Sequence, residues 1–274
     1  QYLNVTHNLI TSSGISNIAF SNFCKLLKLD LSSNSLTGFP KNLGFTACNS
    51  LKLLYMQNNA ISNLDENFLS NLTRLEELNL DNNQILTLKE NGMTYGQNAL
   101  KSLKIQKNKL VSLPSSFLSP LSELETLFLN ENQICCTFGG FNIPNSKIKY
   151  VKLGSNKLTQ LSSGFLNDTS LLRYIFLDNN QISSDLELSG APKNNILEQI
   201  YLQDNEISAL SSEFLSTFYN LRTLDLSRNK LTTLPHPLGL PIGSHLQNFF
   251  FLDNQISGGV AEGYFANVTD LRYI

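Results

Sequence analysis

The sequence predicts a right-handed solenoid of α/β type, built from about eleven similar turns that each contribute one short parallel strand. The first observation behind this prediction is an asparagine that recurs every 24 to 26 residues. A fixed period of this length indicates a stack of like units. The recurring residues are Asn8, Asn34, Asn59, Asn83, Asn108, Asn132, Asn156, Asn180, Asn205, Asn229 and Asn254.

The second observation is an apolar frame that ends at each asparagine. One copy reads Leu75-x-x-Leu78-x-Leu80-x-x-Asn83. The last two leucines stand two residues apart, so both point to the same face of a short strand and the residues between them point outward. The asparagine turns the chain away, and its amide can pair buried backbone groups of its own and adjoining turns. We therefore interpret the asparagines from Asn34 to Asn254 as a structural ladder.

Alternate turns carry a phenylalanine after the frame. Leu64-x-x-x-Phe68 and Leu113-x-x-x-Phe117 are two copies. Frame and phenylalanine together resemble the leucine-rich repeat family, in the "typical" 24-residue subtype of cell-surface receptors and matrix proteins. The resemblance covers nearly the whole chain. It implies a horseshoe or arc, with a parallel β-sheet on the concave side and loops or short 3₁₀ turns on the convex side.

The repeat pattern predicts a single solenoid domain over residues 1–274. The chain has 41% apolar residues, enough for a long continuous core, and contacts in such a stack run only between neighbouring turns. Gln1-Tyr2-Leu3 and Leu271-Arg272-Tyr273-Ile274 both fit the strand part of the frame. Extracellular relatives normally close their ends with cysteine-rich caps, which this sequence lacks. We interpret it as a segment cut from a longer chain, or as a subunit with covered ends.

Composition and motifs argue against several function classes. The net charge of −2 gives no reason to expect nucleic acid, which needs a basic face. No run of 18 or more apolar residues occurs, so no membrane span is expected within the segment. We find no nucleophile with a base, no carboxylate pair and no phosphate loop, so we expect neither an enzyme nor a cofactor. No cysteine and histidine spacing resembles a zinc site, so no metal is expected.

The four cysteines form two pairs of different kinds. Cys24 and Cys48 fall nearly in register on adjacent turns. Neighbouring turns stack about 5 Å apart, so the two can form a disulfide. Two buried thiols are the alternative. Cys135 and Cys136 are adjacent, where a bond is strained, and the sequence leaves their state open.

Four sequons indicate the compartment. They begin at Asn4, Asn71, Asn167 and Asn267. The last three fall on phenylalanine-bearing turns, on the flank that leads away from the sheet, while Asn4 points out of the concave face. Sequon phase and family resemblance together predict a glycoprotein that is extracellular, either secreted or at the cell surface.

The outward strand positions carry the candidate binding residues. The first outward position alternates in charge between neighbouring turns, as in Lys52, Glu76 and Lys101, which indicates a solvated ladder of pairs. The central strand positions are rich in aromatics. Exposed aromatics on a rigid sheet are frequent anchors of an interface, although Phe and Tyr also favour strands for local reasons. The predicted partner-binding residues are Phe128, Tyr150, Tyr174, Phe176 and Tyr201.

Two functions follow from these patterns. The leading one is a receptor-like binding module, an ectodomain or adhesion protein that holds a protein or glycan ligand on its concave sheet. The alternative is a structural scaffold subunit of a sheath, wall or filament, which self-associates head to tail through its uncapped ends. Particle size in solution separates them, because a scaffold forms polymers of distributed length.

Overall fold

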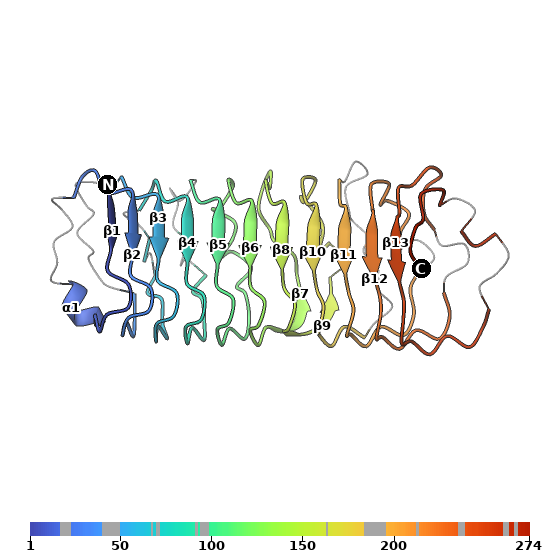
Figure 1. Ribbon diagram of the computed structural model, residues 1–274, viewed down its shortest axis with the longest axis horizontal. Helices are drawn as coiled ribbons and strands as arrows, with labels where there is room; N and C mark the ends of the chain where they lie inside the picture. Colours follow the sequence, from blue (N-terminus) through green and yellow to red (C-terminus); the bar gives the residue numbers. More distant parts are fainter. Residues whose placement is uncertain are drawn as a thin grey trace. The chain divides into compact units, whose positions relative to one another are not determined.

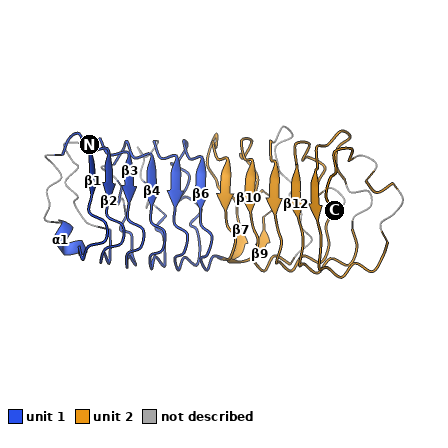
Figure 2. Cartoon of the chain, in the orientation of Figure 1, with its two compact units in different colours: residues 1–134 blue, residues 135–274 orange. Residues whose placement is uncertain are grey.

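The computed structural model divides into two compact units, Gln1–Ile134 (unit 1) and Cys135–Ile274 (unit 2) (Figure 1, Figure 2). Each unit is a stack of turns around its own core of buried leucine, isoleucine and phenylalanine. The structure describes residues 1–16, 23–39, 50–66, 68–69, 72–90, 93, 99–162, 164–183, 196–211, 214–234, 239–259, 263–265 and 268–274.

Unit 1 contains a sheet of short parallel strands that pair in chain order. From β2 to β6 the central residue of each strand is a leucine with no exposed surface, and the residues on either side point outward. This confirms the alternation predicted from the frame. The strands are β1 (Tyr2–Asn4), β2 (Lys28–Asp30), β3 (Leu53–Tyr55), β4 (Glu77–Asn79), β5 (Ser102–Lys104) and β6 (Thr126–Phe128).

Unit 2 continues the same pattern and adds a second strand pair. Its main sheet pairs five strands in parallel, again with buried central residues. These strands are β8 (Tyr150–Lys152), β10 (Tyr174–Phe176), β11 (Gln199–Tyr201), β12 (Thr223–Asp225) and β13 (Asn248–Phe250). The additional parallel pair is β7 (Cys135–Phe138) with β9 (Lys157–Leu161).

Loops form the side of the turns that lies away from the sheet. Within the described residues one helix occurs, α1 (Ser12–Ser16) (Figure 1). The Thr11 hydroxyl oxygen accepts a hydrogen bond from the backbone N–H of Gly14 at 3.1 Å and so caps its first turn, and Ile15 is buried. None of the described helices has the length and apolar character that crossing a membrane requires. The parallel-strand solenoid predicted from the sequence is thus the fold of the chain.

The recurring asparagines satisfy buried backbone groups of two turns at once. In unit 1, the Asn83 amide nitrogen donates to the carbonyls of Leu80 and Asp81 in its own turn and to Met56 in the preceding turn, at 3.0 to 3.2 Å. Its oxygen accepts from the N–H of Ile61 at 3.0 Å. The residue is 2% exposed, so water cannot replace these partners. The ladder therefore ties each turn to its predecessor.

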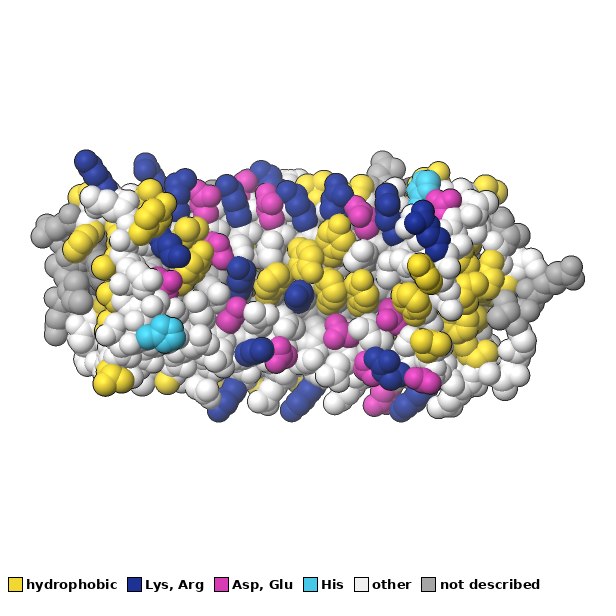
Figure 3. Space-filling view, viewed as in Figure 1, with side chains coloured by type: hydrophobic (Ala, Val, Ile, Leu, Met, Phe, Trp, Pro, Cys, Tyr) yellow, Lys and Arg dark blue, Asp and Glu magenta, His cyan; other side chains and the backbone are white. Residues whose placement is uncertain are grey.

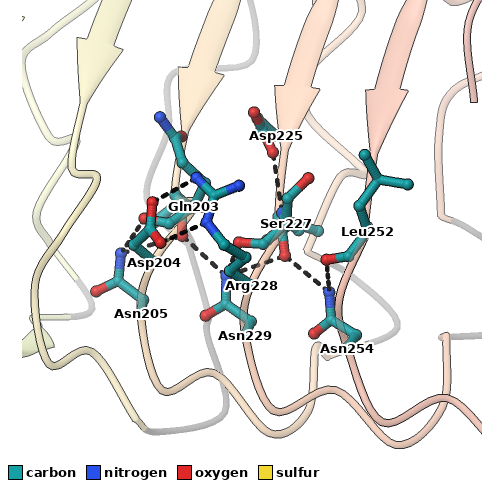
Figure 4. A network of polar contacts seen from close by, with 11 residues as sticks. Gln203, Asp204, Asn205, Asp225, Ser227, Arg228, Asn229, Leu252 and Asn254 are labelled. Carbon is teal, nitrogen blue, oxygen red and sulfur yellow. Dashed lines mark hydrogen bonds and ion pairs between the residues drawn. The ribbon is translucent and has the colours of Figure 1, made fainter.

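Figure 4 shows the same arrangement in unit 2. The Asn229 amide donates to the carbonyls of Leu202, Leu226 and Ser227, and its oxygen accepts from the N–H of Ile207 at 3.0 Å. Asn8, at the start of the chain, differs: it is exposed, and its amide donates to carbonyls of its own turn. These two hydrogen bonds of Asn8 thus stay within its own turn.

A column of residues with left-handed backbone stands immediately before the asparagines, and it was not predicted from the sequence. Their φ angles lie between 51° and 57°, where side chains other than glycine are uncommon. The turn geometry imposes this backbone conformation whatever residue is present. The column consists of His7, Ser33, Asn58, Asn82, Lys107, Glu131, Ser155, Asn179, Asp204, Arg228 and Asp253.

Lys107 offers a test of this column. It is exposed, with φ 55°. Lys107→Val is expected to unfold about 1–2 kcal/mol more easily than Lys107→Asn, because a β-branched residue tolerates left-handed backbone poorly and asparagine tolerates it well. Both variants lose the same ion pair with Glu131, at 3.7 Å, so that loss cancels. Urea unfolding measures the difference, and equal midpoints would contradict the assigned backbone geometry.

The two cysteine pairs differ in state. Cys24 is disulfide-bonded. Its predicted partner, Cys48, lies outside the described residues. Cys135 and Cys136 are free thiols, and both are exposed.

Candidate functional site

The outer face of the unit 1 sheet is occupied by charges that pair with one another. The Lys104 ammonium lies 2.7 Å from the Glu77 carboxylate. The Tyr55 hydroxyl donates to Glu77 at 3.2 Å, and the Lys28 ammonium stands 4.5 Å from the Tyr55 ring centre. Burial, and then the negative charge of Glu77, raise the pKa of Tyr55. The charged groups named here thus already have partners on this face.

Ion pairs run along the edge where the strands begin. Lys52 and Lys101 both contact Glu76, at 2.6 and 3.1 Å, and their hydrogen bonds lower the pKa of that carboxyl. In unit 2, Arg173 contacts Glu198 at 2.5 Å. The alternating charges predicted from the sequence thus form pairs between neighbouring turns. Exposed pairs of this kind contribute little stability and seldom mark a site.

An aromatic cluster occupies the outer face of unit 2. It consists of Tyr150, Tyr174, Phe176 and Tyr201, on β8, β10 and β11, and all four are half-buried. The rings of Phe176 and Tyr201 are stacked, with centres 4.7 Å apart and planes 9° from parallel. The Tyr150 ring lies 5.4 Å from both Tyr174 and Phe176. Figure 3 shows apolar side chains gathered near the centre of the view, where Figure 1 places β8 and β10.

Strand register creates the cluster. Tyr150 pairs with Tyr174, and Phe176 pairs with Tyr201, so side chains from successive turns stand side by side. Four of the five predicted partner-binding residues are therefore brought together. The fifth, Phe128, lies on β6 of unit 1, where it pairs with Lys104. It belongs to the face of unit 1 and is not assigned to the cluster.

Lys152 adds a cation to the cluster, which sequence reasoning missed. Its ammonium stands 5.5 Å from the Phe176 ring centre and 5.8 Å from that of Tyr150. Both distances are within the range of cation–π attraction. Lys152 pairs in register with Phe176. Comparing the outward strand positions of neighbouring turns in the sequence could therefore have revealed it.

Carboxylates border the cluster where the strands end. Asp178 follows β10, and burial, with the charges of Asp204 and Asp225, raises the pKa of its carboxyl. Gly154 lies opposite the Asp178 carboxyl. A Cβ atom at this position would lie 2.5 Å from the Asp178 Oδ1, so glycine leaves room for the carboxyl where it stands. Burial and Asp225 also raise the pKa of Tyr201. The border therefore holds a carboxylate whose ionised form is destabilised, as is frequent at functional sites.

Comparison with known families decides the identity of the repeats. A family model described as "Leucine rich repeat" matches residues 196–239, which include β11 and β12. A second, described as "Leucine Rich Repeat", matches residues 25–45, which include β2. This is a leucine-rich repeat protein. The leucine-rich repeat family predicted from the asparagine frame is thereby confirmed.

Solved leucine-rich repeat structures share the fold over the full chain. A chain in the octameric complex of Latrophilin 3, Unc5D and FLRT2 (LRR) matches with a TM-score of 0.79 and 23% identity, over 100% of this chain and 83% of that one. An internalin from Listeria monocytogenes matches with 0.72 and 21%, over 99% and 74%. The TLR13–ssRNA13 complex matches with 0.70 and 21%, over 99% and 42%. No curated protein matches in sequence.

The acidic border of this leucine-rich repeat protein predicts an unusual pH response. The pKa of Asp178 is raised, so between the ordinary and the raised value the folded chain binds more protons than the unfolded chain. Stability then falls as pH rises through that window. Asp178→Asn is expected to raise Tm at pH 7, with the gain disappearing on acidification towards about pH 4. Thermal melts across this range measure it.

Asp204 supplies a control of opposite sign. Its hydrogen bonds with Arg228, at 2.5 and 2.7 Å, lower its pKa. That stability is present above the ordinary carboxyl pKa and is lost as pH falls through the lowered value. Asp204→Asn is therefore expected to lower Tm at pH 7. A common sign for both variants would contradict the assigned environments.

The predicted glycosylation residues fall partly within the described chain. Asn4 is exposed on β1, with its side-chain oxygen accepting from the Thr6 N–H at 3.0 Å. Asn167 is exposed, while the Thr169 hydroxyl donates to the Leu166 carbonyl at 2.6 Å. Asn71 and Asn267 lie outside the described residues. Both described amides are thus at the surface, as a glycan requires.

Proposed function

We propose that the chain is an extracellular binding module that holds a protein partner on the outer face of the unit 2 sheet, with the aromatic cluster as its anchor. The carrying observation is the cluster itself: four aromatic rings in mutual contact on a strand face, with a stacked pair at one end. Aromatic anchors supply large contact areas at low entropic cost, and they dominate the energetics of interfaces.

The two strand faces support the choice of unit 2. The unit 1 face pairs Lys104 with Glu77 and places Lys28 over Tyr55, so a partner would have to break contacts already made. The unit 2 face offers half-buried rings instead. A partner that covers these rings would remove apolar surface from water, which stabilises the complex by about 25 cal/mol per Å² of buried apolar surface.

The border charges support a protein with basic side chains as the partner. A partner lysine or arginine that reached Asp178 would compensate its half-buried negative charge. The similar structures include protein complexes by their titles, among them Toll with Spatzle from Drosophila, which matches with a TM-score of 0.66 and 18% identity. In this proposal the chain binds such a partner and does not catalyse a reaction on it.

Site-specific photo-crosslinking tests the proposal. A photoreactive amino acid at Gln199, which lies on the cluster strand β11 and pairs with Tyr174 of β10, is expected to capture a partner from the native source. The same group at Ser102, a corresponding outward position on β5 of unit 1, is the matched control. Equal capture from both positions would refute the assignment of the unit 2 face. Capture of a glycan alone would replace the protein partner with a sugar.

Light scattering of the purified chain tests the scaffold alternative. The binding module is expected to behave as a discrete particle that keeps its size on concentration. A length-distributed polymer would favour head-to-tail assembly through the ends instead.

Extracellular placement predicts glycans. We expect Asn167 and Asn4 to be occupied when the chain passes through a secretory pathway, and Asn71 and Asn267 as well. Intact mass before and after enzymatic deglycosylation measures occupancy, and single Asn→Gln variants assign it. An unchanged mass would place the protein in an unglycosylated compartment. Glycans on the flanks would leave the unit 2 face open to its partner.

A further inference from the structure

Two adjacent free cysteines begin strand β7 with their sulfurs in contact. Cys135 and Cys136 are both exposed, and their Sγ atoms lie 2.8 Å apart. A disulfide bond spans about 2.05 Å, so its formation requires an approach of less than about 1 Å. Neither sulfur is committed to the core or to a bond elsewhere in the chain.

Regular strand geometry would keep these sulfurs apart. Successive side chains of a strand point to opposite faces, so adjacent strand cysteines do not normally touch. β7 departs from that geometry at this point: Cys136 has φ 70°, and the register with β9 shifts between Cys136 and Thr137. This bulge brings the two thiols to the same side. Bulges frequently re-aim side chains at functional positions.

We propose that Cys135 and Cys136 form a reversible vicinal disulfide by exchange with a small-molecule disulfide such as oxidised glutathione. This makes the start of β7 a redox modification site, which is separate from the aromatic face and independent of it.

The exchange proceeds in two displacement steps. The Cys135 thiolate attacks one sulfur of the external disulfide, so that a bond to Cys135 forms, the external S–S bond breaks and one thiolate leaves. The Cys136 thiolate then attacks the Cys135 sulfur, which closes the ring and releases the second external thiolate. Two protein thiols are oxidised and one external disulfide is reduced to two thiols, which take up the two protons.

The raised pKa of the Cys136 thiol assigns this residue to the second displacement step. Its hydrogen bond with Cys135, and then the charge of Cys135, raise the pKa of the Cys136 thiol. Once Cys135 has entered a mixed disulfide, its sulfur no longer carries the charge that opposes ionisation of Cys136. Cys136 then acts as the resolving thiol, and its Sγ atom lies 2.8 Å from that of Cys135.

Peptide mass spectrometry after exchange tests the proposal. The intact chain is equilibrated in glutathione buffers of increasing oxidised fraction, quenched with acid, alkylated and digested. We expect the Cys135–Cys136 peptide to lose two hydrogen masses in the oxidised buffers and to regain two alkylated thiols after dithiothreitol. Phenylarsine oxide, which needs two neighbouring thiols, is expected to bind the reduced chain with one arsenic per chain.

Single-cysteine variants complete the test. Cys136→Ser is expected to stop at one stable glutathione adduct on Cys135 and to lose arsenical binding. Cys135→Ser serves as the second variant should the first fail to fold. In the parent chain, stable glutathione adducts, an intermolecular dimer or two persistently alkylatable thiols in fully oxidised buffer would each overturn the vicinal disulfide.

Discussion

Replacement of Asn83 with alanine is expected to lower the free energy of unfolding by about 3 kcal/mol, the upper end of the range for a buried group left unpaired. The variant removes the donor that serves the carbonyls of Met56, Leu80 and Asp81, and the acceptor that serves the N–H of Ile61. Because Asn83 is 2% exposed, water cannot take over these bonds without opening the stack.

Gln84 provides the matched control for this prediction. It is also an amide and is the next residue along the chain, yet its side chain is exposed. Gln84→Ala is expected to change stability by less than about 0.5 kcal/mol. Chemical denaturation of both variants measures the contrast. Equal midpoint shifts would show that the ladder amide contributes no more than a surface side chain.

The sequence was sufficient to predict the fold because the core and the ladder repeat with one period. The positions of Leu78 and Asn83 recur in the other turns as a buried apolar residue and an asparagine, so the pattern of one turn predicts that of the others. The φ of Lys107 could not be predicted in the same way, since lysine has no preference for left-handed backbone and the turn imposes it. The β7–β9 pair was missed because its strands lie outside the apolar frame.

The candidate site was predictable only in part. The outward strand positions were sufficient to predict the four aromatic residues of the cluster, because the register between neighbouring turns follows from the repeat. They did not reveal the fit of Asp178 over Gly154, which depends on side-chain approach between turns. Phe128 stays a prediction, since it lies on β6 of unit 1 and pairs there with Lys104.

Removing the stacked pair is expected to weaken partner binding far more than folding. Phe176→Ala with Tyr201→Ala should reduce affinity by about 2 kcal/mol or more, which is about 30-fold in Kd. Both side chains are half-buried on the outer strand face, so their loss removes ring contacts with each other and leaves the leucine core intact. The effect on Tm is therefore expected to be modest.

Tyr55→Ala distinguishes lost binding from general destabilisation. Tyr55 holds the same outward position on β3 of unit 1, is also half-buried, and contacts Lys28 and Glu77. The variant should cost comparable stability without touching the aromatic cluster. Its affinity for the partner is expected to equal that of the parent chain.

The most direct measurement is the Kd of the captured partner for the parent chain, the Phe176→Ala/Tyr201→Ala variant and the Tyr55→Ala variant, with Tm recorded on the same samples. A loss of about 30-fold or more in the double variant, with parental affinity in Tyr55→Ala, is the result expected for a partner held on the unit 2 face. Parental affinity in the double variant would contradict that assignment.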